Sequence, residues 1–378
     1  MPPKTTSRLS PRQSQPSRVA VILGAGFSSC ADLPLQKAFS RDLLTNDQDN
    51  SLDRIINRAI EDFLEFTFGW KTDDPIPPLE DIFTMIDLSA GTGHALGPRN
   101  PPKRLRALRR LLIYRVFSIL DRRFTYSQPI DRLLHGLFEI DPHTSFIVLN
   151  WDIVLERHLQ HVRPQHCVAY GVNELPWDGH VEDRQLITKL IKVHGSANWV
   201  YCDSCRQIYF DRYSKLSMHI HAGLSRDDLK LFDPQRRNMP NQLHGALCPQ
   251  CHSPVGPHIA TFSYRKSFRT AAFTASWADA EQALSEADRW LFVGYSLPPA
   301  DYEFTHLLKT AELKSARSNE RPIQMHVVVQ QDDNAEARFR QIFGTAIRMV
   351  EQGGLEQYLK EGLHRLKDLH GRKQTSPH

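Results

Sequence analysis

Two CxxC pairs constrain the fold of this chain more than any other feature of its sequence. The first pair is Cys202 and Cys205, and the second is Cys248 and Cys251. Each short loop presents two thiols, and four thiolates suit a tetrahedral zinc ion that joins the two loops. Four protein ligands leave no open position on the ion. We therefore expect a structural zinc that organises a zinc-ribbon module over residues 201–257.

The other two cysteines and the distribution of charge limit the class of protein. Cys30 and Cys167 do not form part of a disulfide framework, which indicates a reducing, cytoplasmic location. No apolar run approaches the ~20 residues that span a bilayer, so we expect no membrane association. Residues 1–18 form a basic stretch rich in Ser and Pro, which accounts for the net charge of +4 and which we interpret as a disordered tail. The near-neutral remainder argues against nucleic acid as a direct ligand.

Short apolar runs alternate with helical patterns, which predicts an α/β fold with a Rossmann-like parallel sheet. The predicted strands cover residues 19–23, 145–149, 187–193, 290–293 and 323–329. The helical patterns lie at residues 153–161, 268–286 and 302–315. We therefore assign the Rossmann-like domain to residues 19–38, 142–200 and 258–350, followed by a C-terminal helix and tail over residues 351–378.

A helical insertion over residues 39–141 interrupts this alternation. Its later part carries leucine and valine at helical spacing on one face. The remaining faces of that helix hold the basic residues Lys103, Arg104, Arg106, Arg109, Arg110, Arg115, Arg122 and Arg123. Such a basic surface is either a solvated helix face or a contact for an acidic partner.

Glycines and polar side chains gather where the predicted strands end. They are Gly24, Ala25, Gly26 and Ser28 after the first strand, Asn150 and Asp152 after the second, His194 after the third, and Gly294, Tyr295 and Ser296 after the fourth. Carboxyl ends of parallel strands meet at one edge of a sheet, where glycine turns let the backbone approach a pyrophosphate. Simpler interpretations exist, because short glycine turns are common and Asn150 and Asp152 could cap the helix that begins near Ile153.

Other residues near these strand ends have weaker signals. Cys30 lacks a nearby positive group that would activate its thiol, so we interpret it as a buried packing residue. Asp301 is expected to cap the helix that follows it. Gln330, Asp332 and Asp333 end the last predicted strand, where the ribose of an adenosine would lie in this topology.

In this order, the motifs resemble those of the sirtuin superfamily, which joins a Rossmann-like NAD domain to a zinc ribbon and breaks the nicotinamide bond of NAD. The GAG-x-S turn of that superfamily is matched at residues 24–28, and its Asn-x-Asp is matched by Asn150 and Asp152. Its catalytic His-Gly is matched by His194 and Gly195, with a CxxC just beyond. The resemblance covers residues 19–330 apart from the helical insertion.

The resemblance implies a role for each matched residue. His194 would be the general base, Asn150 would hold the attacking water or a ribose hydroxyl, and Asp152 would orient the ribose or offset developing positive charge. Ser28 and Ser296 would donate hydrogen bonds to the phosphates. The NAD site would be completed by the turn residues Gly24, Ala25, Gly26, Gly294 and Tyr295.

Several departures separate this chain from the protein deacylases of the superfamily. The first turn continues with DLPLQK at residues 32–37, without the arginine of the deacylases. The sequence ATFSY at residues 260–264 replaces the segment that pairs with an acyl-lysine peptide. The Gly-Thr-Ser that binds NAD phosphate becomes Gly-Tyr-Ser at residues 294–296. LPPAD follows at residues 297–301. That run, with LEDIF at 79–83 and NWDIVLE at 150–156, resembles the bacterial sirtuin-like branch whose members consume NAD in antiphage defence.

The resemblance therefore implies an NAD glycohydrolase that cleaves NAD to nicotinamide and ADP-ribose as a regulated effector of antiphage defence. Control of such an effector implies a homo-oligomer or a regulatory protein partner. One alternative is an NAD-dependent protein lysine deacylase. A second is a non-catalytic module that binds NAD or ADP-ribose.

Overall fold

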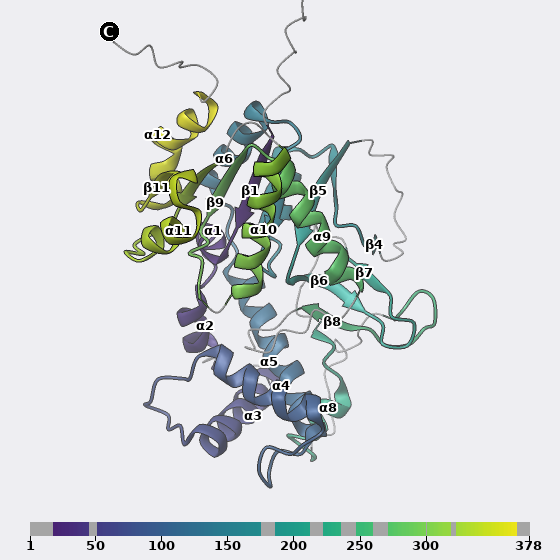
Figure 1. Ribbon diagram of the computed structural model, residues 1–378. Coiled ribbons are helices and arrows are strands. Elements are labelled where there is room, and N and C mark those ends of the chain that lie inside the picture. Colours follow the sequence, from purple (N-terminus) through teal and green to yellow (C-terminus); the bar gives the residue numbers. More distant parts are fainter. Residues whose placement is uncertain are drawn as a thin grey trace, which may run out of the picture.

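The chain is described by a computed structural model over residues 18–44, 51–174, 186–211, 222–235, 247–259, 271–299, 301–318 and 323–368. Within these ranges, seven strands form a parallel sheet and four form a smaller sheet (Figure 1). Most of the predicted basic tail and the segment 260–264 lie outside the described residues. No helix in the described ranges is long and apolar enough to cross a membrane.

The large sheet is doubly wound and confirms the predicted α/β class. Its spatial order is β11 (Ile347–Glu351), β10 (Gln324–Val328), β9 (Arg289–Val293), β1 (Val19–Leu23), β2 (Ser145–Val148), β5 (Leu186–Lys192) and β3 (His166–Ala169). All neighbouring strands are parallel. The edge strands β3 and β11 were not predicted, because both are partly exposed and lack a continuous apolar run.

Alternate residues of each central strand face two different helical layers. Val21 and Leu23 of β1 belong to the core shared with α6 (Gln128–Ile140), α7 (Val154–Val162) and α12 (Gly354–Asp368). Ala20 and Ile22 belong to the core shared with α9 (Ala271–Glu286), α10 (Tyr302–Ser318) and α11 (Ala335–Phe343). Burial on both faces explains the uninterrupted apolar sequence of β1. A short 3-10 turn, η3 (Gly344–Ala346), links α11 to β11.

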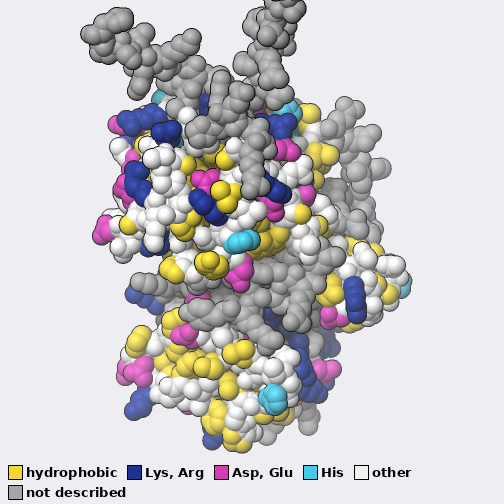
Figure 2. All heavy atoms as spheres, viewed as in Figure 1, with side chains coloured by type: hydrophobic (Ala, Val, Ile, Leu, Met, Phe, Trp, Pro, Cys, Tyr) yellow, Lys and Arg dark blue, Asp and Glu magenta, His cyan; other side chains and the backbone are white. Residues whose placement is uncertain are grey.

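The earlier part of the predicted insertion forms a lobe on the side of the sheet where β1 ends, whereas its last helix, α6, packs against the sheet with α7 and α12. After α1 (Ala25–Ser29) come α2 (Gln36–Asp42), α3 (Ser51–Phe68), α4 (Leu79–Thr92) and α5 (Pro102–Arg123). Figure 1 shows α2 to α5 below the sheet. Hydrophobic side chains gather on the visible face of this lobe in Figure 2, and the exposed apolar residues of α4 include Met85 and Leu88.

The arginines of α5 do not form the free basic face that the sequence suggested. Several of them pair with acids of the same chain, as Arg109 does with Asp87 and Arg115 with Asp53. Arg115 is only 1% exposed, and its guanidinium lies 2.6 Å from the Asp53 carboxylate. Helical periodicity could not reveal these acids because they lie on other elements. The charge of α5 therefore serves largely to hold the insertion together.

The smaller sheet has the order β4 (Asn173–Glu174), β7 (Ile208–Phe210), β6 (Gly195–Tyr201) and β8 (Gly256–Ile259). It extends beyond the 201–257 module on both sides, because β6 begins directly after His194. The helix α8 (Arg226–Lys230) leaves this segment and contacts α5. There, the Arg110 guanidinium donates two hydrogen bonds to Asp228. The insertion and the cysteine-bearing segment therefore contact each other directly.

Candidate active site

The two glycine turns meet at the topological switch point of the large sheet. Gly24 follows β1 and Gly294 follows the adjacent strand β9. From β1 the chain continues to β2 on one side of the sheet, whereas β9 lies on the other side. In doubly wound sheets, ligands bind at this crevice beyond the carboxyl ends of the strands. The fold therefore brings the predicted strand-end residues to the edge where a binding site is expected.

The glycines in these turns are required because the two backbones touch. A Cβ on Gly24 would lie 2.5 Å from the Gly294 carbonyl oxygen, and one on Gly294 would lie 2.0 Å from the Phe27 nitrogen. Gly294 also has a φ of +66°. The N–H groups of Gly24, Gly26 and Gly294 all donate to backbone carbonyls. Ala25 is exposed beside them.

Asn150, Ser28 and Asp152 form one hydrogen-bonded chain. The Asn150 side-chain amide donates to the Gly24 carbonyl and to the Ser28 hydroxyl, both at 2.8 Å. The Ser28 hydroxyl in turn donates to the Asp152 carboxylate at 2.8 Å. Ser28 is 3% exposed, so its hydroxyl positions the two strand-end side chains here and is not directed at a phosphate. Asp152 also accepts from the Val154 N–H, which agrees with the capping interpretation.

Lys192 binds the backbone of the Asn150–Asp152 loop, and the sequence analysis did not identify it as a site residue. Its ammonium donates to the Asn150 and Asp152 carbonyls at 3.3 and 2.5 Å. It also pairs with Glu156 at 2.9 Å, and both side chains are fully buried. The Tyr170 hydroxyl donates to the same Glu156 oxygen. A lysine inside the apolar run 187–193 was the available signal, because a buried ammonium requires partners.

His194 lies between β5 and β6 with both ring nitrogens near acceptors. Nδ1 is 3.2 Å from the Leu149 carbonyl oxygen, which cannot donate. Nδ1 therefore carries the proton in the neutral ring, and Nε2 carries the lone pair. Nε2 is 3.7 Å from the Asp301 carboxylate. This is the tautomer that a general base needs, with a carboxylate close enough to stabilise the imidazolium form.

Asp301 and Tyr295 are buried residues close to His194, and their side chains are hydrogen-bonded to each other. The Asp301 backbone carbonyl accepts from the Thr305 N–H in the first turn of α10, which places Asp301 directly before this helix. Capping of the helix by the Asp301 side chain stays a prediction. The Asp301 side-chain carboxylate accepts from the Tyr295 hydroxyl at 3.0 Å. Burial raises the pKa of Tyr295 well above its usual range, which keeps this hydroxyl a donor. Tyr295 therefore points into the core, although the sequence predicted a cofactor contact.

The turn after β9 is fixed by a second ion pair. The Arg338 guanidinium donates to the Ser296 carbonyl at 2.9 Å and pairs with Asp332 at 2.6 Å. Asp332 thus lies near the adjoining turn but is engaged by an arginine. Ser296 is half-buried, so its hydroxyl remains a candidate for a ligand contact.

Burial raises the pKa of the Cys30 thiol, which agrees with a packing role.

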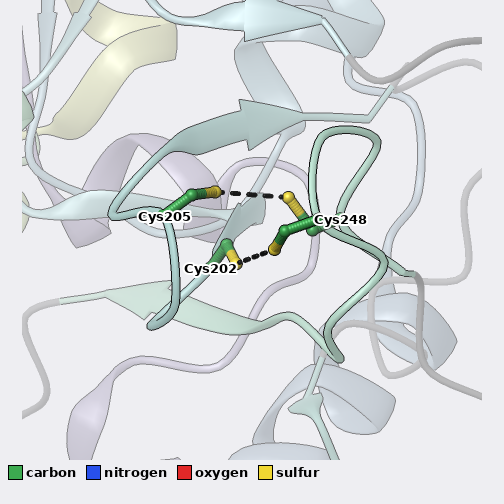
Figure 3. A group of neighbouring side chains, drawn as sticks. Cys202, Cys205 and Cys248 are labelled. Atoms are coloured by element: carbon green, nitrogen blue, oxygen red, sulfur yellow. Dashed lines mark hydrogen bonds between the residues drawn. The ribbon is translucent and has the colours of Figure 1, made fainter.

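The four CxxC cysteines converge into one cluster (Figure 3). Their sulfur atoms all lie within 4.8 Å of one another, and the pairs Cys202–Cys251 and Cys205–Cys248 are each separated by 3.4 Å. A tetrahedral zinc with bonds of about 2.3 Å places its sulfurs about 3.8 Å apart, so the donor set fits this ion. Desolvation opposes ionisation of Cys248, but backbone N–H groups of Cys251 and Gln250 lower its pKa to about 6.

The two cysteine loops have matching backbone geometry. Arg206 directly follows the first CxxC and His252 the second, and both have positive φ values, of 58° and 57°. Their N–H groups donate to the carbonyls of Cys202 and Cys248. Non-glycine residues rarely adopt this conformation, so the shared strain indicates that both loops are shaped for the same purpose.

In comparisons with known proteins, the chain is similar only to solved structures. No protein-family model and no curated protein matches the chain. One similar solved structure is Sir2 with an inhibitor, 2′-O-acetyl-ADP-ribose and a deacetylated p53 peptide, at 15% identity and a TM-score of 0.38, covering 92% of this chain and 93% of that one. Another is Sir2Tm bound to a propionylated peptide, at 14% identity and a TM-score of 0.40, covering 92% of each chain. These values are too low to assign a family, so the function is argued from the site itself.

Proposed function

We propose that this protein is an NAD glycohydrolase that cleaves NAD to nicotinamide and ADP-ribose. The observation that carries the proposal is the convergence of His194, Asn150 and Asp152 at the switch point of a doubly wound sheet, beside two glycine turns. The order of these motifs is that of the sirtuin superfamily. The 2′-O-acetyl-ADP-ribose in a similar Sir2 structure agrees with this substrate class.

The proposed reaction breaks the bond between the nicotinamide nitrogen and C1′ of the ribose. The electron pair leaves with nicotinamide, and water adds its oxygen to C1′ while losing a proton to a base. The transition state carries positive charge on the ribose, as in glycoside hydrolysis. Asp152 would offset this charge, Asn150 would hold the water, and His194 Nε2 would accept the proton. Asp301, near Nε2, would then stabilise the imidazolium.

The four cysteines would hold a zinc ion away from the chemical step. Such an ion supplies a covalent-like link between the two CxxC loops and leaves no position for substrate. Because β6 runs from His194 to the first cysteine loop, the cluster would secure the strand that begins at the catalytic histidine. Zinc would therefore be required for folding of the small sheet.

Product analysis tests the reaction directly. The purified chain is incubated with NAD, with and without an acetylated peptide, beside His194→Ala and Asp301→Asn variants. We expect nicotinamide and ADP-ribose without peptide, and a loss of about 10²- to 10⁴-fold in His194→Ala. Peptide-dependent acetyl-ADP-ribose would instead identify a deacylase, and stabilisation by NAD without turnover would identify a binding module.

Asp301→Asn separates a positioning role from a structural one. The variant keeps the backbone carbonyl that accepts from the Thr305 N–H, so we expect a normal fold. The loss of the negative charge near Nε2 should lower kcat and shift the acidic limb of its pH profile to lower pH, because the imidazolium is less stabilised. An unchanged pH profile would remove Asp301 from the mechanism.

We further propose that the enzyme acts in the cytoplasm as a regulated effector of antiphage defence. Resemblance to the NAD-consuming sirtuin-like branch supports this role, and restraint of such an activity would require a homo-oligomer or a regulatory protein partner. Cells producing the wild-type chain should lose NAD after phage infection, whereas His194→Ala cells should not. Constant NAD in infected wild-type cells that contain active enzyme would contradict the defence role.

A further inference from the structure

A cavity of about 310 Å³ lies in the helical insertion, outside the candidate active site. Its walls come from α3, from the turn before α5, from α5 itself and from the segment after α8. The lining residues are Ala59, Asp62, Phe63, Phe66, Arg99, Asn100, Arg104, Leu108 and Phe232. None of them belongs to the strand-end site or to the cysteine cluster. Any ligand held here would therefore occupy a site separate from that of the proposed reaction.

Two arginines that line the cavity form cation–π contacts with aromatic rings. Arg104 lies 4.4 Å from the centre of the Phe232 ring, and Arg99 lies 5.2 Å from that of Phe66. Arg104 is anchored through the Leu231 carbonyl and is only 4.0 Å from Asp62, at the limit of an ion pair. Among the described residues, no carboxylate forms an ion pair with Arg99. The lining therefore carries net positive charge next to flat apolar surfaces.

Asn100 adds a polar group that has no hydrogen-bond acceptor among the described residues. Its residue is 4% exposed, and no acceptor for its side-chain Nδ2 lies in the described part of the chain. The turn that carries it packs tightly, since a Cβ on Gly97 would lie 2.9 Å from the Phe66 ring. A buried amide without an acceptor costs stability unless something else accepts its hydrogen.

We propose that this cavity is a binding site for a small amphipathic anion, with a planar apolar body and one phosphate or carboxylate group. The aromatic and aliphatic walls formed by Phe63, Phe66 and Leu108 suit the body. Arg99 and Arg104 suit the anionic group, because guanidinium pairs well with either oxyanion. Asp62 opposes the anion and limits its affinity. Pockets with apolar walls and a few convergent polar groups are typical small-molecule sites.

Calorimetry with phenyl phosphate as the probe tests this site on the full chain. We expect saturable binding, weakened about tenfold in Arg99→Gln by the loss of one charge-assisted hydrogen bond. Asp62→Asn should bind more tightly, because it removes a repelling charge. Arg106→Gln is the matched control, since Arg106 is an exposed arginine of the adjoining helix α5 that does not line the cavity.

Further probes identify the group that is recognised. Benzoate replaces the phosphate with a carboxylate, and the tighter of the two anions shows which head group the arginines prefer. Inorganic phosphate and phenol supply the charge and the ring separately, and each should bind much more weakly than phenyl phosphate. The proposal is overturned by the absence of saturable binding, by equal weakening in Arg106→Gln, or by inorganic phosphate that binds as tightly as phenyl phosphate.

Discussion

Replacing Lys192 with methionine should destabilise the protein far more than a typical lysine substitution. Lys192 and Glu156 form a fully buried ion pair at 2.9 Å, so the variant leaves a carboxylate in the core without its cation. Removing one partner of such a pair costs about 3 to 5 kcal/mol. Lys189→Met is the matched control on the same strand. Lys189 is half-exposed and pairs with Asp279 at 3.0 Å, and surface pairs contribute at most about 1 kcal/mol.

The double variant Lys192→Met with Glu156→Gln distinguishes stability from positioning. Glutamine keeps an acceptor for the Tyr170 hydroxyl, and two neutral side chains replace the buried pair. We expect the double variant to recover to within about 1 kcal/mol of the wild type, because neutral replacements of buried pairs are often tolerated. NAD turnover should stay low, since the Asn150 and Asp152 carbonyls have lost their donor.

Urea unfolding followed by circular dichroism measures these free energies, and NAD turnover is assayed on the same preparations. The coupling free energy from the double-mutant cycle should exceed about 2 kcal/mol. Two results would refute the reasoning. One is a cost for Lys192→Met no larger than that for Lys189→Met, and the other is full activity in the double variant.

Three more predictions test other parts of the structure. Gly294→Ala should unfold the protein or destabilise it much more than Gly344→Ala. Both glycines have positive φ, but only a Cβ on Gly294 would clash with a neighbouring backbone. Similar melting temperatures of the two variants would contradict this. Metal analysis should find stoichiometric zinc in the wild type and none in Cys248→Ser. Hydrogen exchange should show that the small sheet is unfolded in this variant, and an intact metal-free sheet would refute the prediction. Burial lowers the pKa of His326 to about 4, so the folded protein favours the neutral ring. The stabilisation from this residue is fully present above pH 6.5, its pKa in the unfolded chain. The free energy of unfolding should fall by up to about 3 kcal/mol as the pH drops toward 4. Urea unfolding at pH 7 and pH 5 should show a smaller difference in His326→Gln, and an equal difference would exclude this residue as the source.

The sequence by itself determined the class of fold and the donor set of the cysteine cluster. Continuous apolar runs such as Val19–Leu23 predict strands that are buried on both faces, and their alternation with helical patterns predicts a parallel sheet between two helical layers. Strand ends in such a sheet share one edge, so Asn150 and His194 could be placed together without coordinates. The CxxC spacing likewise sets two thiols at each loop, whatever the surrounding fold.

Tertiary structure decided what each of these residues contacts. Ser28 turned toward Asp152, Tyr295 turned into the core, and Asp301 approached His194, because hydrogen-bond partners far apart in sequence are fixed only by packing. The arginines of α5 met acids on other helices for the same reason. Local periodicity tells which face of an element is buried, whereas the partner of a buried polar group depends on how distant elements are brought together.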